Sequence, residues 1–101
     1  MTPSPKRAFV VSQSAAFELN AAFHWYEGRK VGLGHEYLAS AETLFAQIAA
    51  GPESFRRVKG ETRRGLLTRF PYGVFFVADG SRVVVLAVLH VRVAMERWPS
   101  R

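Results

Sequence analysis

Apolar residues in the first half of the chain recur at three- and four-residue intervals, the spacing of an amphipathic helix. Ala16, Leu19, Phe23 and Tyr26 form the first such stripe. The residues just before it, Ser12-Gln13-Ser14, carry side chains that can begin a helix by accepting hydrogen bonds from its first free N–H groups. This pattern predicts a first helix.

A second apolar stripe follows a break in the chain at Gly28, Gly32 and Gly34. Gly51-Pro52 is a typical signal for the end of that second helix. Its members are Tyr37 or Leu38, then Ala41, Phe45 and Ile48. Two amphipathic helices with a short link predict a helical hairpin whose apolar face must pack on another layer.

The rest of the chain consists of strand-like runs separated by turn signals. The runs predicted as strands are Arg7–Val11, Arg64–Phe70, Val74–Ala78 and Val83–Leu89. Asp79-Gly80-Ser81 is a strong hairpin signal between the last two. Val83–Leu89 contains no polar residue, which predicts a central strand covered on both faces.

These patterns predict one α+β domain over residues 1–101, with a flexible tail at 1–5 and a short tail at 91–101. In this fold an N-terminal strand and the two-helix hairpin pack on a mostly antiparallel sheet of three to four strands. The chain has no cysteine, which excludes disulfides and thiolate zinc sites. No apolar run has the length of a signal peptide or a membrane span, so we expect a soluble, cytoplasmic protein.

Positive charge is concentrated in the second half of the chain. Residues 1–50 hold four basic and four acidic side chains, whereas residues 51–101 hold ten basic and four acidic ones, so the net charge of +6 lies there. Between Arg56 and Arg69 there are six basic residues and one acid, Glu61. Such a patch attracts polyanions or acidic protein surfaces, and a solvated basic face is the alternative interpretation.

Conventional catalytic or metal-binding sets are absent from the sequence. His24 and His35 lie on different predicted helices without metal-ligand spacing, so neither a metal nor a cofactor is predicted. His90 ends the predicted central strand and is followed by Arg92 and Arg97. A neutral imidazole there can accept a proton, and the alternative is that it only caps the strand through a hydrogen bond.

Three ordered segments carry a resemblance to a known family: WYEGRKVGLGHEYL, FRRVKGETRRGLLTRFPYGVFF, and VVVLAVLHVR with a following tryptophan. Together they resemble the RelE/ParE superfamily of toxins from bacterial type II toxin–antitoxin systems, and are most similar to the ParE-like, plasmid-stabilisation branch. The resemblance extends from about Arg7 to Trp98 and implies the fold described above.

The resemblance implies two activities. RelE-like members cut messenger RNA in the ribosome with basic residues on the sheet, whereas ParE-like members poison DNA gyrase by binding. At the places where RelE-like toxins carry two lysines, an arginine and a C-terminal tyrosine, this chain aligns by eye with Gly65, Leu67, Gly73 and Trp98. The resemblance therefore favours a gyrase poison, with a RelE-like ribosome-dependent mRNA endoribonuclease as the alternative.

The resemblance also implies site residues for the target. The candidate catalytic residues are Lys59, Arg64 and His90. The predicted target-binding residues, for gyrase or for the ribosome and mRNA, are Arg64, Arg69, His90, Arg92 and Trp98.

A type II toxin further implies an antitoxin partner. We expect a cognate ParD-like antitoxin with an acidic, partly disordered segment that folds on a basic groove between the hairpin and the sheet. Its predicted anchors are Phe17, Trp25, Tyr37 and Leu44, which we expect to be partly exposed without the antitoxin.

Overall fold

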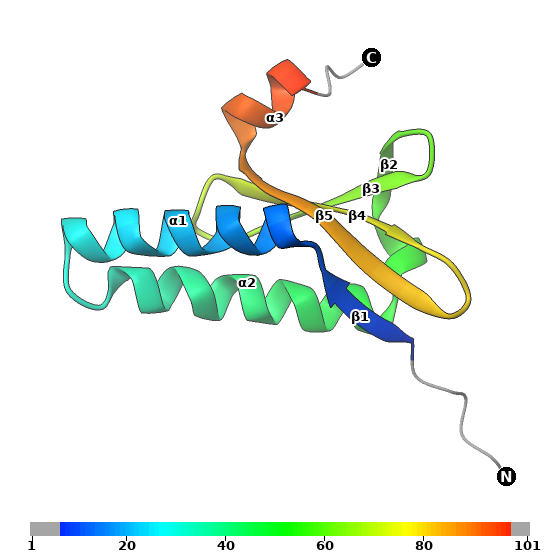
Figure 1. Ribbon diagram of the computed structural model, residues 1–101, viewed down its shortest axis with the longest axis horizontal. Helices are drawn as coiled ribbons and strands as arrows, with labels where there is room; N and C mark the ends of the chain where they lie inside the picture. The colour runs from blue at the N-terminus through cyan, green and yellow to red at the C-terminus, as the bar shows by residue number, and fades with distance from the viewer. Residues whose placement is uncertain (1–6, 98–101) are drawn as a thin grey trace, which may run out of the picture.

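The computed structural model describes residues 7–97 and shows a helical hairpin on one face of a five-stranded sheet, with a short C-terminal helix over part of the other face (Figure 1). The elements are β1 Ala8–Val11, α1 Gln13–Arg29, α2 Leu33–Ala50, a 3-10 turn Pro52–Ser54, β2 Arg56–Lys59, β3 Thr62–Leu66, β4 Tyr72–Ala78, β5 Arg82–His90 and α3 Val91–Arg97. No helix within residues 7–97 is both long and apolar enough to cross a membrane.

The strand order is β1-β5-β4-β3-β2, with β1 parallel to β5 and all other pairs antiparallel. This confirms the predicted α+β class, but the sheet has five strands instead of three to four. The additional strand is β2, which pairs with β3 through a turn at Gly60, where φ is +55°. Its sequence, RRVK, has one apolar residue, so backbone pairing rather than an apolar pattern holds it in the sheet.

The hairpin begins where the sequence predicted, because Ser12 caps α1. Its Oγ accepts a hydrogen bond from the N–H of Ala15 at 3.1 Å, and its own N–H donates to the carbonyl of Val85 at 3.0 Å. Gly51 and Pro52 end α2 as predicted. Asp79 also forms the predicted β4–β5 turn, where its Oδ1 accepts hydrogen bonds from the N–H groups of Ser81 and Arg82.

The main core lies between the hairpin and the sheet, and it corrects the predicted stripe of α2. Its fully or nearly fully buried α2 side chains are Tyr37, Ala41, Leu44 and Ile48. Phe45, which the sequence placed in that stripe, is only partly buried and packs against Phe9, with ring centroids 5.4 Å apart. Tyr37, Ala41 and Ile48 are therefore buried as predicted, and only Leu44 takes the place of Phe45, because both positions fit a three- or four-residue spacing.

A second, smaller apolar cluster lies on the opposite face of the sheet. Val74 and Phe76 of β4 belong to the main core, whereas Phe75 between them packs with Ala87, Leu89 and Ala94. Side chains alternate between the faces of a strand, so this second cluster marks the face away from the hairpin. The prediction that β5 is covered on both faces is therefore confirmed for its C-terminal half, where α3 supplies the second cover.

Two predicted boundaries are wrong. The strand predicted at Arg64–Phe70 ends at Leu66, because the chain turns through a loop in which Arg69 has φ +75°. Residues 91–97 of the predicted tail form α3. The start of α3 is tied to the sheet by a hydrogen bond from the Val91 N–H to the Pro71 carbonyl at 2.8 Å.

Candidate functional site

A groove of about 680 Å³ runs between α1 and the C-terminal end of β5, where α3 begins. The side chains that line it are mostly apolar and come from three parts of the chain: Phe17, Ala21, Trp25 and Tyr26 from α1, Pro71 and Tyr72 from β4 and its preceding loop, and His90 and Val93 from the β5–α3 junction. An apolar concave surface of this size is typical of a binding site for another molecule.

The edge of β5 closes one side of this groove, and a carboxylate satisfies its backbone. β1 pairs with β5 only as far as Val85. Beyond that point Glu18 of α1 reaches across, and its Oε1 accepts a hydrogen bond from the N–H of Val88 at 2.8 Å. Glu18 Oε2 also lies 3.9 Å from Nη1 of Arg97. Glu18 thus connects α1, β5 and α3, a role that no sequence pattern indicated.

Phe17 and Trp25 are exposed at this groove, as the sequence analysis expected. Phe17 is 75% and Trp25 53% exposed, and both line the groove. The guanidinium of Arg29 stacks over the Trp25 ring, 4.4 Å from its centroid. Large exposed aromatic side chains of this kind are the usual anchors of protein interfaces.

Tyr37 and Leu44 are not exposed, so the expectation that they present themselves to an antitoxin is wrong. Tyr37 is fully buried, and Leu44 nearly so. Tyr37 packs with Tyr26, Phe70 and Tyr72, with ring centroids 5.4 to 5.6 Å away. Burial raises the pKa of the Tyr37 hydroxyl, and the nearby Tyr72 adds to the shift. Both residues stabilise the hairpin on the sheet.

The three candidate catalytic residues do not lie on one face of the sheet. Lys59 pairs with Thr62 in the β2–β3 ladder, and Thr62 and Arg64 are two residues apart on β3. Gly65, the next residue of β3, faces the hairpin, because a Cβ there would lie 2.9 Å from Leu44 Cδ1. Lys59 and Arg64 therefore share the face away from the hairpin.

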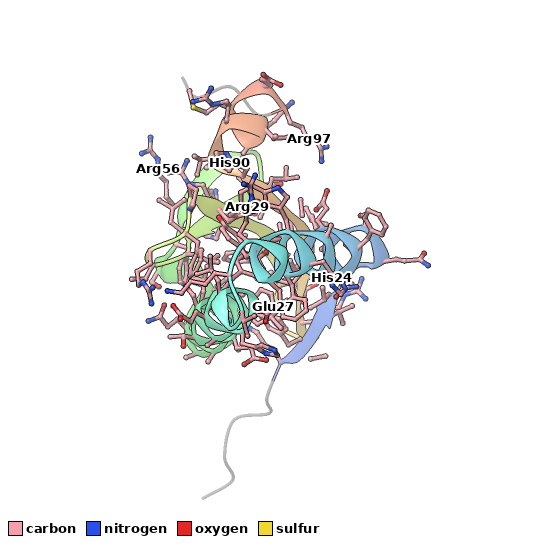
Figure 2. All side chains as sticks on the ribbon, turned by 90° about the vertical axis from the view of Figure 1, so that its left-hand side faces the viewer. His24, Glu27, Arg29, Arg56, His90 and Arg97 are labelled. Atoms are coloured by element: carbon pink, nitrogen blue, oxygen red, sulfur yellow. The ribbon has the colours of Figure 1, made fainter. Side chains whose placement is uncertain are left out.

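His90 lies on the hairpin side. It pairs with Tyr72 across the β4–β5 ladder, and its ring lies edge-on to the Tyr72 ring with centroids 5.4 Å apart. Tyr72 packs against the main core, and His90 lines the groove beside α1 (Figure 2). Its Nδ1 accepts a hydrogen bond from the N–H of Arg92 at 3.1 Å, as in the capping interpretation, although the N–H belongs to α3.

The remaining predicted target contacts are scattered. Arg69 lies in the β3–β4 loop and pairs with Glu36 of α2 at 2.8 Å. Arg92 is on the first turn of α3. Trp98 lies outside the residues that the structure describes. Within residues 7–97 no three His, Asp or Glu side chains gather in a way that could hold a metal ion.

The structure shows where the described positions of the alignment by eye lie. Gly65 faces Leu44 and Phe55, and Leu67 is buried, so neither position presents a side chain on the face away from the hairpin. Gly73 does lie on that face, because a Cβ there would meet the Phe75 ring at 3.0 Å and Arg64 Cγ at 3.5 Å. Of these three positions only Gly73 lies on the face away from the hairpin.

Comparison with known proteins identifies the family. Residues 9–95 match the family described as ParE toxin of type II toxin-antitoxin system, parDE.

The chain belongs to the ParE toxin family.

The fold of this ParE toxin agrees with that assignment. A structure described as "Chromosomal ParDE TA system from P. aeruginosa" superimposes with a TM-score of 0.64 and 16% sequence identity, covering 84% of this chain and 96% of the other. At that identity the likeness concerns the fold. A comparison with curated proteins finds no match. The motifs WYE and GLG have a structural role in this ParE toxin, since Glu27 of the first binds the backbone of the second.

Proposed function

We propose that this ParE toxin inhibits bacterial growth by binding DNA gyrase without cutting nucleic acid itself, and that a cognate ParD-like antitoxin neutralises it. The observation that carries the proposal is the separation of the candidate catalytic groups. A ribonuclease needs groups that activate the ribose hydroxyl, neutralise the phosphate and protonate the leaving oxygen at one place. His90 lies on the opposite side of the sheet from Lys59 and Arg64.

The groove beside α1 supports the antitoxin part of the proposal. Phe17 and Trp25 present aromatic surface there, and the chain carries a net charge of +6. An amphipathic segment with an apolar stripe and an acidic flank complements such a surface, because its apolar side chains cover the aromatics while an acid meets Arg29, which stacks on Trp25. In this proposal Arg64, Arg69, His90 and Arg92 remain available as contacts to the target.

The test is to induce the chain without antitoxin and to follow growth, translated messages and the chromosome. Filamentous cells with a DNA-damage response and intact messages support gyrase as the target. Purified gyrase incubated with the chain should then accumulate cleaved DNA. Rapid decay of translated messages with intact chromosomes would instead establish the RelE-like endoribonuclease, and unimpaired growth would contradict both.

Two substitutions separate chemistry from binding. His90→Gln removes the imidazole, and Lys59→Met removes the ammonium group from the opposite face. If either group performs acid–base chemistry, its loss abolishes toxicity. If both are contacts at most, each change weakens target binding by no more than about 1–3 kcal/mol and toxicity persists at higher expression.

A further inference from the structure

Arg56 of β2 and Arg64 of β3 are directly opposite each other in the antiparallel ladder. Directly opposite residues of an antiparallel pair project from the same face with Cβ atoms roughly 5 Å apart, and like charges in that arrangement are destabilising. Among the residues from 7 to 97, neither guanidinium group has an acidic partner or a hydrogen-bond acceptor. The fold therefore places two positive charges together without a counterion.

The adjacent pair of the same ladder shows the contrast. Arg57 and Arg63 are also opposite each other, but both have partners. Arg57 Nη2 lies 3.5 Å from Glu61 Oε1, and Arg63 Nη1 donates to the carbonyl of Phe55 at 2.7 Å. One opposed arginine pair is thus compensated within the chain, whereas the other, an exposed Arg56 beside a half-buried Arg64, has no partner within residues 7–97.

The uncompensated pair lies on the face away from the hairpin. Arg64 precedes Gly65 on β3, and Gly65 faces Leu44 of the hairpin, so the Arg64 side chain projects from the opposite face. A Cβ at Gly73, which lies on that opposite face, would be 3.5 Å from Arg64 Cγ. Figure 2 shows Arg56 projecting outward from β2, away from α1 and α2. Lys59 shares this face and, within the part of the chain that the structure describes, also has no ionic partner.

We propose that Arg56 and Arg64 together bind the phosphodiester backbone of double-stranded DNA. Two guanidinium groups on neighbouring strands can donate to both non-bridging oxygens of one phosphate, in the planar geometry that arginine favours. Binding removes the repulsion between the two side chains, and Lys59 further along β2 meets the next phosphate. Both arginines are on backbone-paired strands, so the distance between their Cα atoms is set before the DNA binds.

The surroundings favour a duplex backbone over a protein surface or a single strand. The apolar side chains in the middle of this face, Phe75, Ala87 and Leu89, are buried beneath α3 and beside Val58. Phe75 is the aromatic residue that β4 places on this face, and it is only 2% exposed. Within residues 7–97 the surface beside the arginines shows no exposed aromatic side chain, the usual hot spot of protein interfaces and the stacking platform of single-strand binding, although Leu66 of β3 is 52% exposed there. We therefore expect this surface to contact the phosphates of a duplex without recognising its base sequence.

The experiment measures binding of the purified, antitoxin-free chain to a short, labelled, mixed-sequence DNA duplex by fluorescence anisotropy at several salt concentrations. We expect Arg56→Gln and Arg64→Gln each to weaken binding several-fold at low salt, and the double variant to reduce the slope of log K against log salt by about 0.9, the value for one phosphate contact. Arg57→Gln is the matched control, since it removes the same charge from the same strand on the other face. We expect its slope to equal that of the wild type.

Three results would overturn the proposal. These are no duplex binding by the wild type at low salt, an equal loss in Arg57→Gln, or tighter binding to single-stranded RNA of the same length. Thermal unfolding of each variant shows whether it folds, and Arg56, which is exposed, can carry the test alone if Arg64→Gln unfolds. The assay contains no gyrase, so a failure here is distinct from a failure of the proposed gyrase inhibition.

Discussion

Oε1 of Glu27, on the last turn of α1, accepts a hydrogen bond from the backbone N–H of Gly34 at 2.9 Å. Oε2 of the same carboxylate accepts one from the N–H of Gly32 at 2.8 Å. The N-cap of α2 is Gly32, with φ +92°, and a glycine has no side chain that could cap the helix. The end of one helix thus satisfies the free N–H groups at the start of the next, and the negative carboxylate lies at the positive end of the α2 dipole.

Replacing Glu27 by Gln should lower the Tm by a few degrees, because an amide offers one acceptor oxygen in place of two and carries no charge toward the helix dipole. Circular dichroism at neutral pH measures the change. Glu42→Gln, on the exposed surface of α2, is the control and should leave the Tm unchanged. An unaltered Tm in Glu27→Gln would contradict a capping role.

The stabilisation by Glu27 should depend on pH. The hydrogen bonds from Gly32 and Gly34 lower the pKa of Glu27 from its ordinary value of 4.5. Because the pKa is lower in the folded than in the unfolded state, the contribution is fully present above 4.5 and is lost as the pH falls through the folded-state pKa. The Tm difference between wild type and Glu27→Gln should therefore stay constant down to that range and then shrink. A difference that grows on acidification would have the wrong sign.

Gly34→Ala should destabilise the chain by roughly 1–3 kcal/mol, the usual cost of forcing extra atoms into a packed site. A Cβ at position 34 would lie 2.6 Å from the carbonyl oxygen of Phe23 and 2.9 Å from Glu27 Cβ, so the two helices would have to separate. Gly28→Ala is the control, since a Cβ there meets nothing within 4 Å. It should be neutral or stabilising by up to about 1 kcal/mol, because alanine favours the helix. Urea unfolding of both variants measures the contrast.

Tyr37→Phe should not destabilise the chain. The Tyr37 hydroxyl is buried, and no group within residues 7–97 forms a hydrogen bond with it. A buried hydroxyl without a partner costs about 1–3 kcal/mol, whereas the phenylalanine ring keeps the contacts with Tyr26, Phe70 and Tyr72. Urea unfolding should give an unchanged or higher free energy of unfolding. Tyr37→Ala, by comparison, should lose about 3–5 kcal/mol. A clear loss in Tyr37→Phe would indicate that the hydroxyl binds a buried water.

Phe17→Ser and Trp25→Ala should weaken antitoxin binding without unfolding the chain. Both side chains are largely exposed, so their effect on stability should stay within about 0.5 kcal/mol. At an interface each should cost about 2 kcal/mol or more, roughly a thirtyfold rise in Kd for a ParD-like antitoxin measured by titration calorimetry. Val31→Ser is the control, because Val31 is 90% exposed in the link between α1 and α2 and does not line the groove. Equal effects of all three would argue against the groove as the docking site.

The hairpin could be predicted because its signals are local. Ser12 begins α1, Gly51 and Pro52 end α2, and the apolar spacing between them covers both helices. The β4–β5 hairpin was predictable for the same reason, since Asp79 makes the turn with its immediate neighbours.

The start of α3 depends on residues distant in the sequence. The Val91 N–H bonds to the Pro71 carbonyl, and Ala94 packs against Phe75. Seven residues are too few to show a helical period, and without those contacts so short a helix is not stable. β2 was not predicted for a similar reason: its sequence, RRVK, has almost no apolar pattern, and its pairing with β3 depends on the fold.

For the candidate site, too, the sequence indicated residue types but not which of them are exposed. Phe17 and Tyr37 are both aromatic residues on amphipathic helices, yet one is 75% exposed and the other is buried. Helical spacing shows which residues share a stripe but not which stripe meets the sheet. Likewise, the family resemblance grouped Arg64 and His90 as candidate catalytic residues, although strand register places them on opposite faces.

By itself the sequence determined the class of the fold, the two helices of the hairpin, the concentration of basic residues in the second half, and the ordered motifs typical of the ParE family. Local propensities, caps and charge are properties of short segments, so they can be read without the fold. Only the tertiary structure decided which aromatic side chains are exposed, that Glu27 caps α2, and that Arg56 lies opposite Arg64 without a counterion. These relationships depend on strand register and helix rotation, which are set by packing between segments far apart in the chain.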